Sequence, residues 1–179
     1  KRAAEIFAAR GLPHRRVEAW HYTDLRNLQR EAYALADCAV DCAPVAGVTI
    51  MRLSEAIAAN RIDVISALAP EAGSDDASVA LNAGLARDSI VILVAAGVTV
   101  ETPIEIRFNA GQGPRAEFAR SLVVLGAGAN ASIVETHFAS ASTQRNSALI
   151  VKLGEGAALD HLFVSAQDAP EQHVSTLIA

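Results

Sequence analysis

The chain is 179 residues long, about one domain's worth, and its 51% hydrophobic content argues against disorder throughout. Alanine supplies 37 of the apolar residues and only 4% of the chain is aromatic, so we expect a core of small, repetitive packing units. The absence of a G-x-y period and of a sustained heptad excludes collagen and coiled coil. No apolar run approaches the roughly 18 residues of a membrane helix, so we expect no membrane partner.

The net charge of −5 is distributed unevenly. Residues 1–30 carry a local charge of +4, and residues 31–179 carry −9. A uniform basic face is therefore not expected, and neither is a nucleic-acid partner. The basic start could steer an acidic partner, although a solvated amphipathic helix is the simpler interpretation.

The only two cysteines are Cys38 and Cys42. Two are too few for a disulfide framework and the start has no signal-peptide pattern, so we expect a cytoplasmic, reducing environment. The spacing could place both thiols on one helical face. A metal site would need two more ligands, which the neighbouring sequence does not supply, so inert thiols are the favoured interpretation.

Residues 1–86 are predicted to form an N-terminal helical and irregular region. Spacing, caps and breakers define its elements. In chain order they are a helix over 1–10 ended by Gly11, an ordered loop over 14–30 leading into a short helix capped by Thr23 or Asp24, an exposed stretch over 31–50, a helix over 55–60 with Ser54 as N-cap, a helix from Asp63 to Leu68 ended by Pro70, a loop over 73–76, and a helical turn from Val79 to Leu85.

Residues 87–179 have the pattern of short strands bounded by turns. The predicted strands are Ile90–Val94, Val98–Phe108 with an interruption at Pro103, Leu122–Leu125, Ser132–Phe138, Leu149–Leu153, Leu159–Val164 and Val174–Ile178.

A strand–glycine turn–strand unit repeats in this second region. Leu125–Ala129 and Leu153–Ala157 are two copies 28 residues apart, and Ala95–Val98 is a degenerate copy about 31 residues earlier. Such a period favours the stacked coils of a β-helix, with glycine allowing positive φ and close stacking at the turns. A β-sandwich is the alternative, because its strands also recur at short intervals.

The sequence lacks the short motifs of nucleotide-binding proteins, acyl-transfer enzymes and metal-dependent hydrolases, and no nucleophile–base pair is apparent. We therefore assign no catalytic, cofactor-binding or metal residue. His161 shares a strand face with Leu159 and Phe163, which predicts a buried, hydrogen-bonded imidazole. The acids at alternating strand positions are expected on a solvent face, with ion binding as the alternative; they are Glu101, Glu105, Glu135 and Asp160.

One segment, residues 11–25, is unusual because it holds the only tryptophan. Trp20 and Tyr22 are expected to anchor it to the protein body. Arg15 and Arg16 are expected to bind nearby carboxylates. A partner surface is the other interpretation. The residues singled out in this signature segment are Gly11, Leu12, Pro13, Arg15, Glu18, Trp20, Tyr22, Thr23 and Asp24.

The signature segment resembles the pattern G-L-P-x-x-R-x-E-x-W-[RK]-Y-T-D-[LF] near the start of SufD-type members of the SufB/SufD family, departing from it at His21. Two further parts of the chain are similar to the family's β-helix. They are Leu81–Leu85 with Asp88–Ile92 and Gly97–Ile104, and Arg120–Ala129 with Val134–His137.

The resemblance implies a right-handed parallel β-helix core, and a non-catalytic scaffold role in the SufBCD machinery of iron–sulfur cluster assembly. The implied partners are a SufB-like homologue and a SufC-like ATPase, the latter bound through a C-terminal region. The family's cluster-building residues lie beyond Ala179, so no site residue is carried over. The iron–sulfur cluster belongs to the full complex, and no cofactor is expected in this chain.

Two other identities stay open: a free-standing β-helix enzyme acting on a carbohydrate or small molecule, and the SufB paralogue. The lack of clustered acids and aromatics disfavours the first, and the G-L-P segment disfavours the second. The start at Lys1 without methionine and the stop inside the apolar-alternating run Val174–Ala179 predict the leading part of a longer protein. A β-helix interrupted there would expose an edge and favour self-association.

Overall fold

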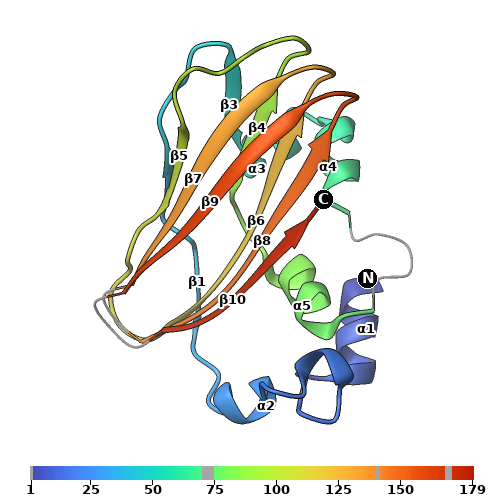
Figure 1. Ribbon diagram of the computed structural model, residues 1–179. Helices are drawn as coiled ribbons and strands as arrows, with labels where there is room; N and C mark the ends of the chain where they lie inside the picture. The colour runs from blue at the N-terminus through green and yellow to red at the C-terminus, as the bar shows by residue number, and fades with distance from the viewer. Residues whose placement is uncertain (1, 70–74, 140–141, 168–170) are drawn as a thin grey trace.

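The computed structural model describes residues 2–69, 75–139, 142–167 and 171–179, and it is mainly β with mixed sheets and N-terminal helices (Figure 1). The helices are α1 (Arg2–Arg10), the 3-10 helix η1 (Glu18–Trp20), α2 (Leu25–Leu28), α3 (Leu53–Ala58), α4 (Ile62–Ala67) and α5 (Ala77–Leu85). The strands are β1 (Leu35–Ala36), β2 (Val40–Cys42), β3 (Val48–Arg52), β4 (Ile90–Val94), β5 (Ile104–Phe108), β6 (Arg115–Leu125), β7 (Asn130–Ala139), β8 (Thr143–Leu153), β9 (Ala158–Gln167) and β10 (Glu171–Ile178).

The helix ends follow local capping chemistry. Gly11 ends α1 as predicted: it adopts φ +64° and donates its N–H to the Phe7 carbonyl at 2.7 Å. Asp24, one of the two predicted caps, accepts the N–H of Asn27 at 3.0 Å at the start of α2. Asp76 caps α5 by accepting the N–H groups of Ser78 and Val79, so this helix starts earlier than predicted.

The prediction that Ser54 caps α3 was wrong. The helix begins at Leu53, and the Glu55 carboxylate accepts the backbone N–H of Arg52 at 2.9 Å. Ser54 instead binds the Asp88 carboxylate with its N–H and its hydroxyl, both at 3.0 Å. The predicted helix stop at Pro70 lies outside the described residues, as do residues 73 and 74 of the predicted loop over 73–76.

Most residues over 31–50 are exposed, as predicted, but the stretch also contains strands that were not predicted. Strands β1, β2 and β3 lie here and pair with β6, β5 and β4 respectively. Val40 on β2 is only 1% exposed. Because these strands are short and broken by polar residues, their alternation is too brief to mark them in the sequence.

From β4 to β10, successive strands alternate between two sheets. One sheet has the order β10-β8-β6-β4-β3, with β1 also on β6, and the other has the order β2-β5-β7-β9. Figure 1 shows β5, β7 and β9 as one layer, and β6, β8 and β10 as the layer beside the helices. These later strands pair with one another in parallel. By contrast, β2 pairs antiparallel with β5, and β3 pairs antiparallel with β4.

The predicted repeat is confirmed by the register. Leu125 lies opposite Val94 on one side and Leu153 on the other, so equivalent positions are 31 and then 28 residues apart. The 28-residue offset also relates β8 to β10 and β7 to β9. Side chains one repeat apart therefore stack on each other across the sheets.

Each glycine turn uses its two glycines for different purposes. A Cβ on Gly126 would lie 2.5 Å from the backbone nitrogen of Ala96, and one on Gly154 would lie 2.5 Å from that of Ala127. The first glycine of each unit thus allows neighbouring turns to touch. The second, Gly128 or Gly156, adopts φ of +67° or +68°, where other residues are strained.

Two layers of apolar side chains hold the elements together. The larger cluster lies between the sheets and takes residues from β2, β4, β5, β6, β7 and β8. The smaller one packs Leu53, Ala56 and Val64 of α3 and α4 against Val91 and Leu122 on the outer face. No helix in the described part of the chain is both long and apolar enough to cross a membrane.

Helix α5 docks on the same outer face through buried polar contacts. The Asn82 side chain is 0% exposed and donates to the carbonyls of Ala119 at 2.8 Å and Asn146 at 2.9 Å. Arg120 donates to the Asn82 side-chain oxygen at 3.1 Å and to the Leu68 carbonyl at 2.8 Å. Because each contact satisfies a buried polar group, it sets where the helix can sit on the sheet.

We expect Gly126→Ala and Gly154→Ala to destabilise the fold by about 1–3 kcal/mol each, because the added Cβ would overlap backbone atoms of the preceding turn. Urea unfolding measures the difference. Gly84→Ala is the matched control: its Cβ meets only Ala3, at 4.0 Å, and alanine favours helix α5. Unfolding midpoints that are equal for all three variants would contradict the close-stacking role.

Candidate functional site

A ladder of polar side chains lies between the sheets where an apolar core is expected. Glu117 on β6 is the register partner of Arg145 on β8, and Arg145 is the partner of His173 on β10. Glu117 is 1% exposed and Arg145 is 0% exposed. The 28-residue repeat thus places a carboxylate, a guanidinium and an imidazole on three neighbouring strands of one sheet.

Arg145 is the centre of this ladder. Its Nε and NH2 groups donate to Glu117 Oε2 at 3.0 and 2.8 Å, and NH2 also donates to the Phe138 carbonyl at 3.2 Å. Its NH1 group lies 3.1 Å from Glu171 Oε1. Two buried carboxylates and a carbonyl therefore compensate a guanidinium that is removed from water.

Glu135 and two histidines form the part of the cluster on the facing sheet. Glu135 Oε1 lies 2.7 Å from Nε2 of His137, and Oε2 lies 2.9 Å from Nε2 of His161. Nδ1 of His137 lies 3.4 Å from the Arg145 guanidinium. The Phe108 ring stacks on His137 at a centroid distance of 4.3 Å.

The electrostatics keep Glu135 ionised. Burial raises the pKa of this carboxyl, but the hydrogen bonds and charges of His137 and His161 outweigh burial and lower the pKa from 4.5 to about 2. A buried carboxylate with both oxygens occupied by N–H donors is a fixed negative charge inside the fold.

His173 lies at the other side of the cluster. Its Nε2 is 2.9 Å from the Ser147 hydroxyl, and its ring is 4.5 Å from that of His137 between centroids. Burial, and then the positive charges of His137 and Arg145, lower the pKa of His173 from 6.5 to about 3, against the opposing effect of Glu135. This imidazole is neutral at physiological pH.

The polar groups of this interior cluster are used mainly on one another. Within residues 2–69, 75–139, 142–167 and 171–179, no group of three histidine, cysteine or acidic side chains is arranged to hold a metal ion. Glu117 Oε1 has no hydrogen bond and lies 3.7 Å from the Arg115 guanidinium. The arrangement orders charge and joins neighbouring strands, and it offers no exposed nucleophile.

The two cysteines lie on or beside β2 rather than on a helix, which corrects the helical-face interpretation. Burial, and next the charge of Glu117, raise the pKa of Cys38 to about 12. Burial alone raises the pKa of Cys42 to about 11. Both thiols are free and protonated at neutral pH, so neither is a ready ligand or nucleophile.

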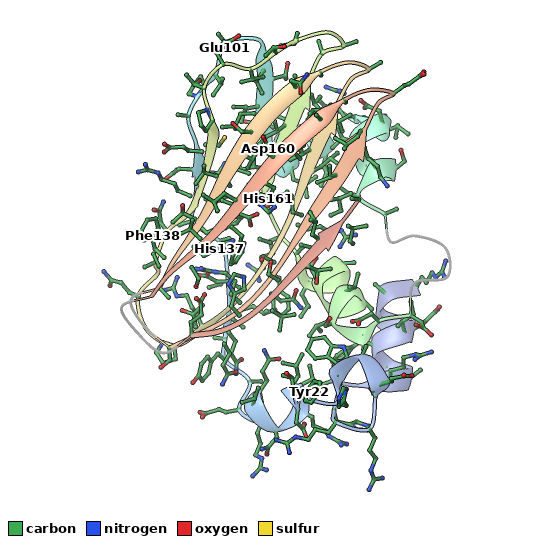
Figure 2. The ribbon with its side chains drawn as sticks, viewed as in Figure 1. Tyr22, Glu101, His137, Phe138, Asp160 and His161 are labelled. Carbon is green, nitrogen blue, oxygen red and sulfur yellow. The ribbon has the colours of Figure 1, made fainter. Side chains whose placement is uncertain are left out.

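The predicted strand polars divide into two groups. Glu101, Glu105 and Asp160 are exposed, as expected for a solvent face. Glu135 is only 4% exposed, so its prediction was wrong, because its strand position points between the sheets. His161 is hydrogen-bonded to Glu135, as predicted, but it is only partly buried, with its side chain 17% exposed. Figure 2 shows His137 and His161 on adjacent strands, with Asp160 beside His161.

The signature segment is held from its inner side. The Trp20 indole donates to the Asp76 carboxylate at 3.2 Å, which ties the segment to the cap of α5. Pro13 is buried, and its carbonyl accepts the N–H of Arg26 at 3.2 Å. Leu12 lines a hollow shared by α1, α5 and β6. Trp20 is therefore an anchor, as predicted.

The outer side of the signature segment differs from prediction. Tyr22 is 87% exposed, so it anchors nothing within the described chain (Figure 2). Arg15 and Arg16 are exposed and form no ion pair with Glu18, Asp24 or any other described residue. The Thr23 N–H donates to the Trp20 carbonyl at 2.8 Å, which keeps the segment in tight consecutive turns.

Sequence reasoning missed Glu117 and Arg145, yet a signal for them exists. The two residues carry opposite charges and are separated by one 28-residue repeat. Once a repeat is recognised, opposite charges at its period predict a stacked pair. No protein-family model matches the chain, and no curated protein matches it.

We expect Arg145→Met to cost about 3–5 kcal/mol, because it leaves Glu117 buried without its cation. The double variant Glu117→Gln/Arg145→Met should lose less than the sum of its single changes, which a double-mutant cycle in urea measures. Arg107→Ala, which breaks the exposed pair with Glu105, is the control and should cost about 1 kcal/mol or less. An Arg145→Met variant as stable as this control would refute the role of the ladder.

We expect His173 to make the fold sensitive to acid. The unfolded chain takes up this proton below pH 6.5 and the folded chain only near pH 3, so stability is full above pH 6.5 and falls toward pH 3. The loss is on the order of 4 kcal/mol across that interval. His173→Gln should flatten the stability curve there, as measured by urea unfolding at a series of pH values. Ser175→Ala, on the same strand, should leave the slope unchanged, and an unchanged slope in His173→Gln would contradict the assignment.

Proposed function

We propose that this chain is the leading part of a SufD-like subunit, and that it serves as a non-catalytic scaffold in iron–sulfur cluster assembly. Its fold under this proposal is a right-handed parallel β-helix entered from an N-terminal helical region. The partners are a SufB-like homologue and a SufC-like ATPase in the cytoplasm. The cluster is a product of the assembled complex, and no cofactor is assigned to this chain.

The strand arrangement supports the β-helix. Strands β4 to β10 alternate between two sheets, pair in parallel, and keep a 28-residue offset in their later coils. Short turns with a close-stacking glycine join them on one side, as coils of a solenoid require. An antiparallel sandwich would pair neighbouring strands through hairpins instead.

The observation that carries the proposal is that the three stretches resembling the family interlock. Trp20 of the first binds Asp76, the cap of α5, and Asn82 of the second lies on that helix. The Asn82 side chain accepts a hydrogen bond from Arg120 of the third stretch. Three stretches that together form one buried structural unit are expected to contact one another in this way.

Two features favour a scaffold over an enzyme. The interior polar groups are bonded to one another, and Glu135 has both oxygens occupied. Strands β9 and β10 end their sheets in the described chain, and they are suited to pair with a further coil or with a second copy. The self-association expected at Val174–Ile178 stays a prediction.

The test is to tag the full-length gene product in its own cells and to purify it under mild conditions. We expect it to co-purify with a homologous β-rich subunit and an ATPase, and we expect its deletion to lower the activity of iron–sulfur enzymes. Restoring the gene is the control for the deletion. A protein that runs alone, in cells whose iron–sulfur enzymes are unaffected by the deletion, would overturn the proposal.

A further inference from the structure

Residues 14–30 present their outer side chains on a fixed base. Trp20 is bound to Asp76, and Leu25 is only 4% exposed. The backbone N–H of Arg26 is bound to the Pro13 carbonyl. A surface on such a segment loses little conformational entropy when it binds another molecule.

Three large apolar side chains of this segment are exposed. Tyr22 is 87% exposed, Leu28 is 52% exposed and Val17 is 40% exposed. The Tyr22 ring lies 3.6 Å from that of His21 between centroids, so its nearest aromatic neighbour is itself at the surface. Figure 2 shows Tyr22 at the end of the molecule away from His137 and His161. Exposed tyrosine beside arginine is the composition of protein–protein contact centres.

The exposed arginines of this segment have fewer carboxylate partners than those elsewhere on the surface. Arg15, Arg16 and Arg26 are exposed and make no ion pair in the described parts of the chain. Four arginines outside the segment have carboxylate partners; the pairs are Arg10–Asp75, Arg61–Asp63, Arg87–Asp37 and Arg107–Glu105. The segment therefore carries positive charge that the chain itself does not neutralise.

A hollow is lined in part by the same segment, through Val17, Ala19 and Trp20. It has a volume of about 250 Å³, and its walls include Pro13, Val17, Trp20 and Ala77. The acids at its rim are already engaged, since Asp75 pairs with Arg10, and Asp76 caps α5. The hollow is suited to one bulky apolar side chain.

From these features we propose that the outer side of residues 14–30 docks an acidic segment of another protein that carries one bulky apolar side chain. Its carboxylates meet Arg15, Arg16 and Arg26, its apolar side chain enters the hollow, and Tyr22 covers the contact. This inference does not depend on the proposed function. A protein fits better than a nucleic acid, because residues 31–179 carry a charge of −9 and repel a long polyanion.

The test measures fluorescence anisotropy of short labelled peptides against the full chain. The probe is a glutamate-rich peptide with one central tryptophan; one control peptide replaces glutamate by glutamine, and another replaces tryptophan by alanine. We expect the probe to bind at least about 10-fold more tightly than either control. Binding should weaken with salt.

Two variants locate the contact. Tyr22→Ala and the double variant Arg15→Ala/Arg16→Ala should each weaken binding about 10-fold or more without changing the melting temperature, because these side chains contribute no ion pair or core packing. Arg107→Ala and Leu162→Ala are matched controls on distant strands and should bind as the parent does.

Three outcomes would overturn the inference. The first is equal binding of the probe by Tyr22→Ala, the double arginine variant and the parent. The second is equal binding of the probe and its glutamine control. The third is tighter binding of single-stranded DNA, or of phosphatidylserine vesicles, with the same dependence on Arg15 and Arg16, which would assign the surface to that class of partner.

Discussion

The contact of backbone with backbone at the glycine turns is the constraint on which the rest of the structure depends. Neighbouring turns can touch only where Gly126 and Gly154 leave out a Cβ. That contact fixes the register, at 31 residues for the Gly126 turn and 28 for the Gly154 turn, because a slip of one residue would move a side chain into the gap and turn every inward residue outward. The register in turn stacks equivalent side chains from strand to strand, polar ones included.

This stacking explains how a charged interior can be tolerated. A single buried arginine would be costly, but the register places a carboxylate directly beside Arg145 and an imidazole on its other side. On the facing sheet, hydrogen bonds from His137 and His161 stabilise the negative charge of Glu135. The cluster thus joins neighbouring strands across the interior of the fold. Such a cluster also limits where change is tolerated: the surface at residues 14–30 can vary without disturbing it.

The sequence predicts those parts of the fold that repeat. The glycine turns and β-branched runs predict the strands and their period, and Gly11 and Asp24 predict local helix ends. Strands β6 and β8 each have 11 residues, far more than their apolar runs indicate, because Glu117, Arg120 and Arg145 interrupt the hydrophobic pattern while remaining in the sheet. The prediction that Glu135 is exposed was wrong because alternation alone does not tell which face of a strand is buried. The prediction for Tyr22 was wrong because the sequence does not tell which of two nearby aromatic rings binds the protein body, and it is Trp20 that does so.

The ladder also has a consequence for how the chain is made. β6 is synthesised before β8, so Glu117 precedes its buried cation, Arg145, by 28 residues of chain. Glu117 and Arg145 can both leave water only when β8 pairs with β6.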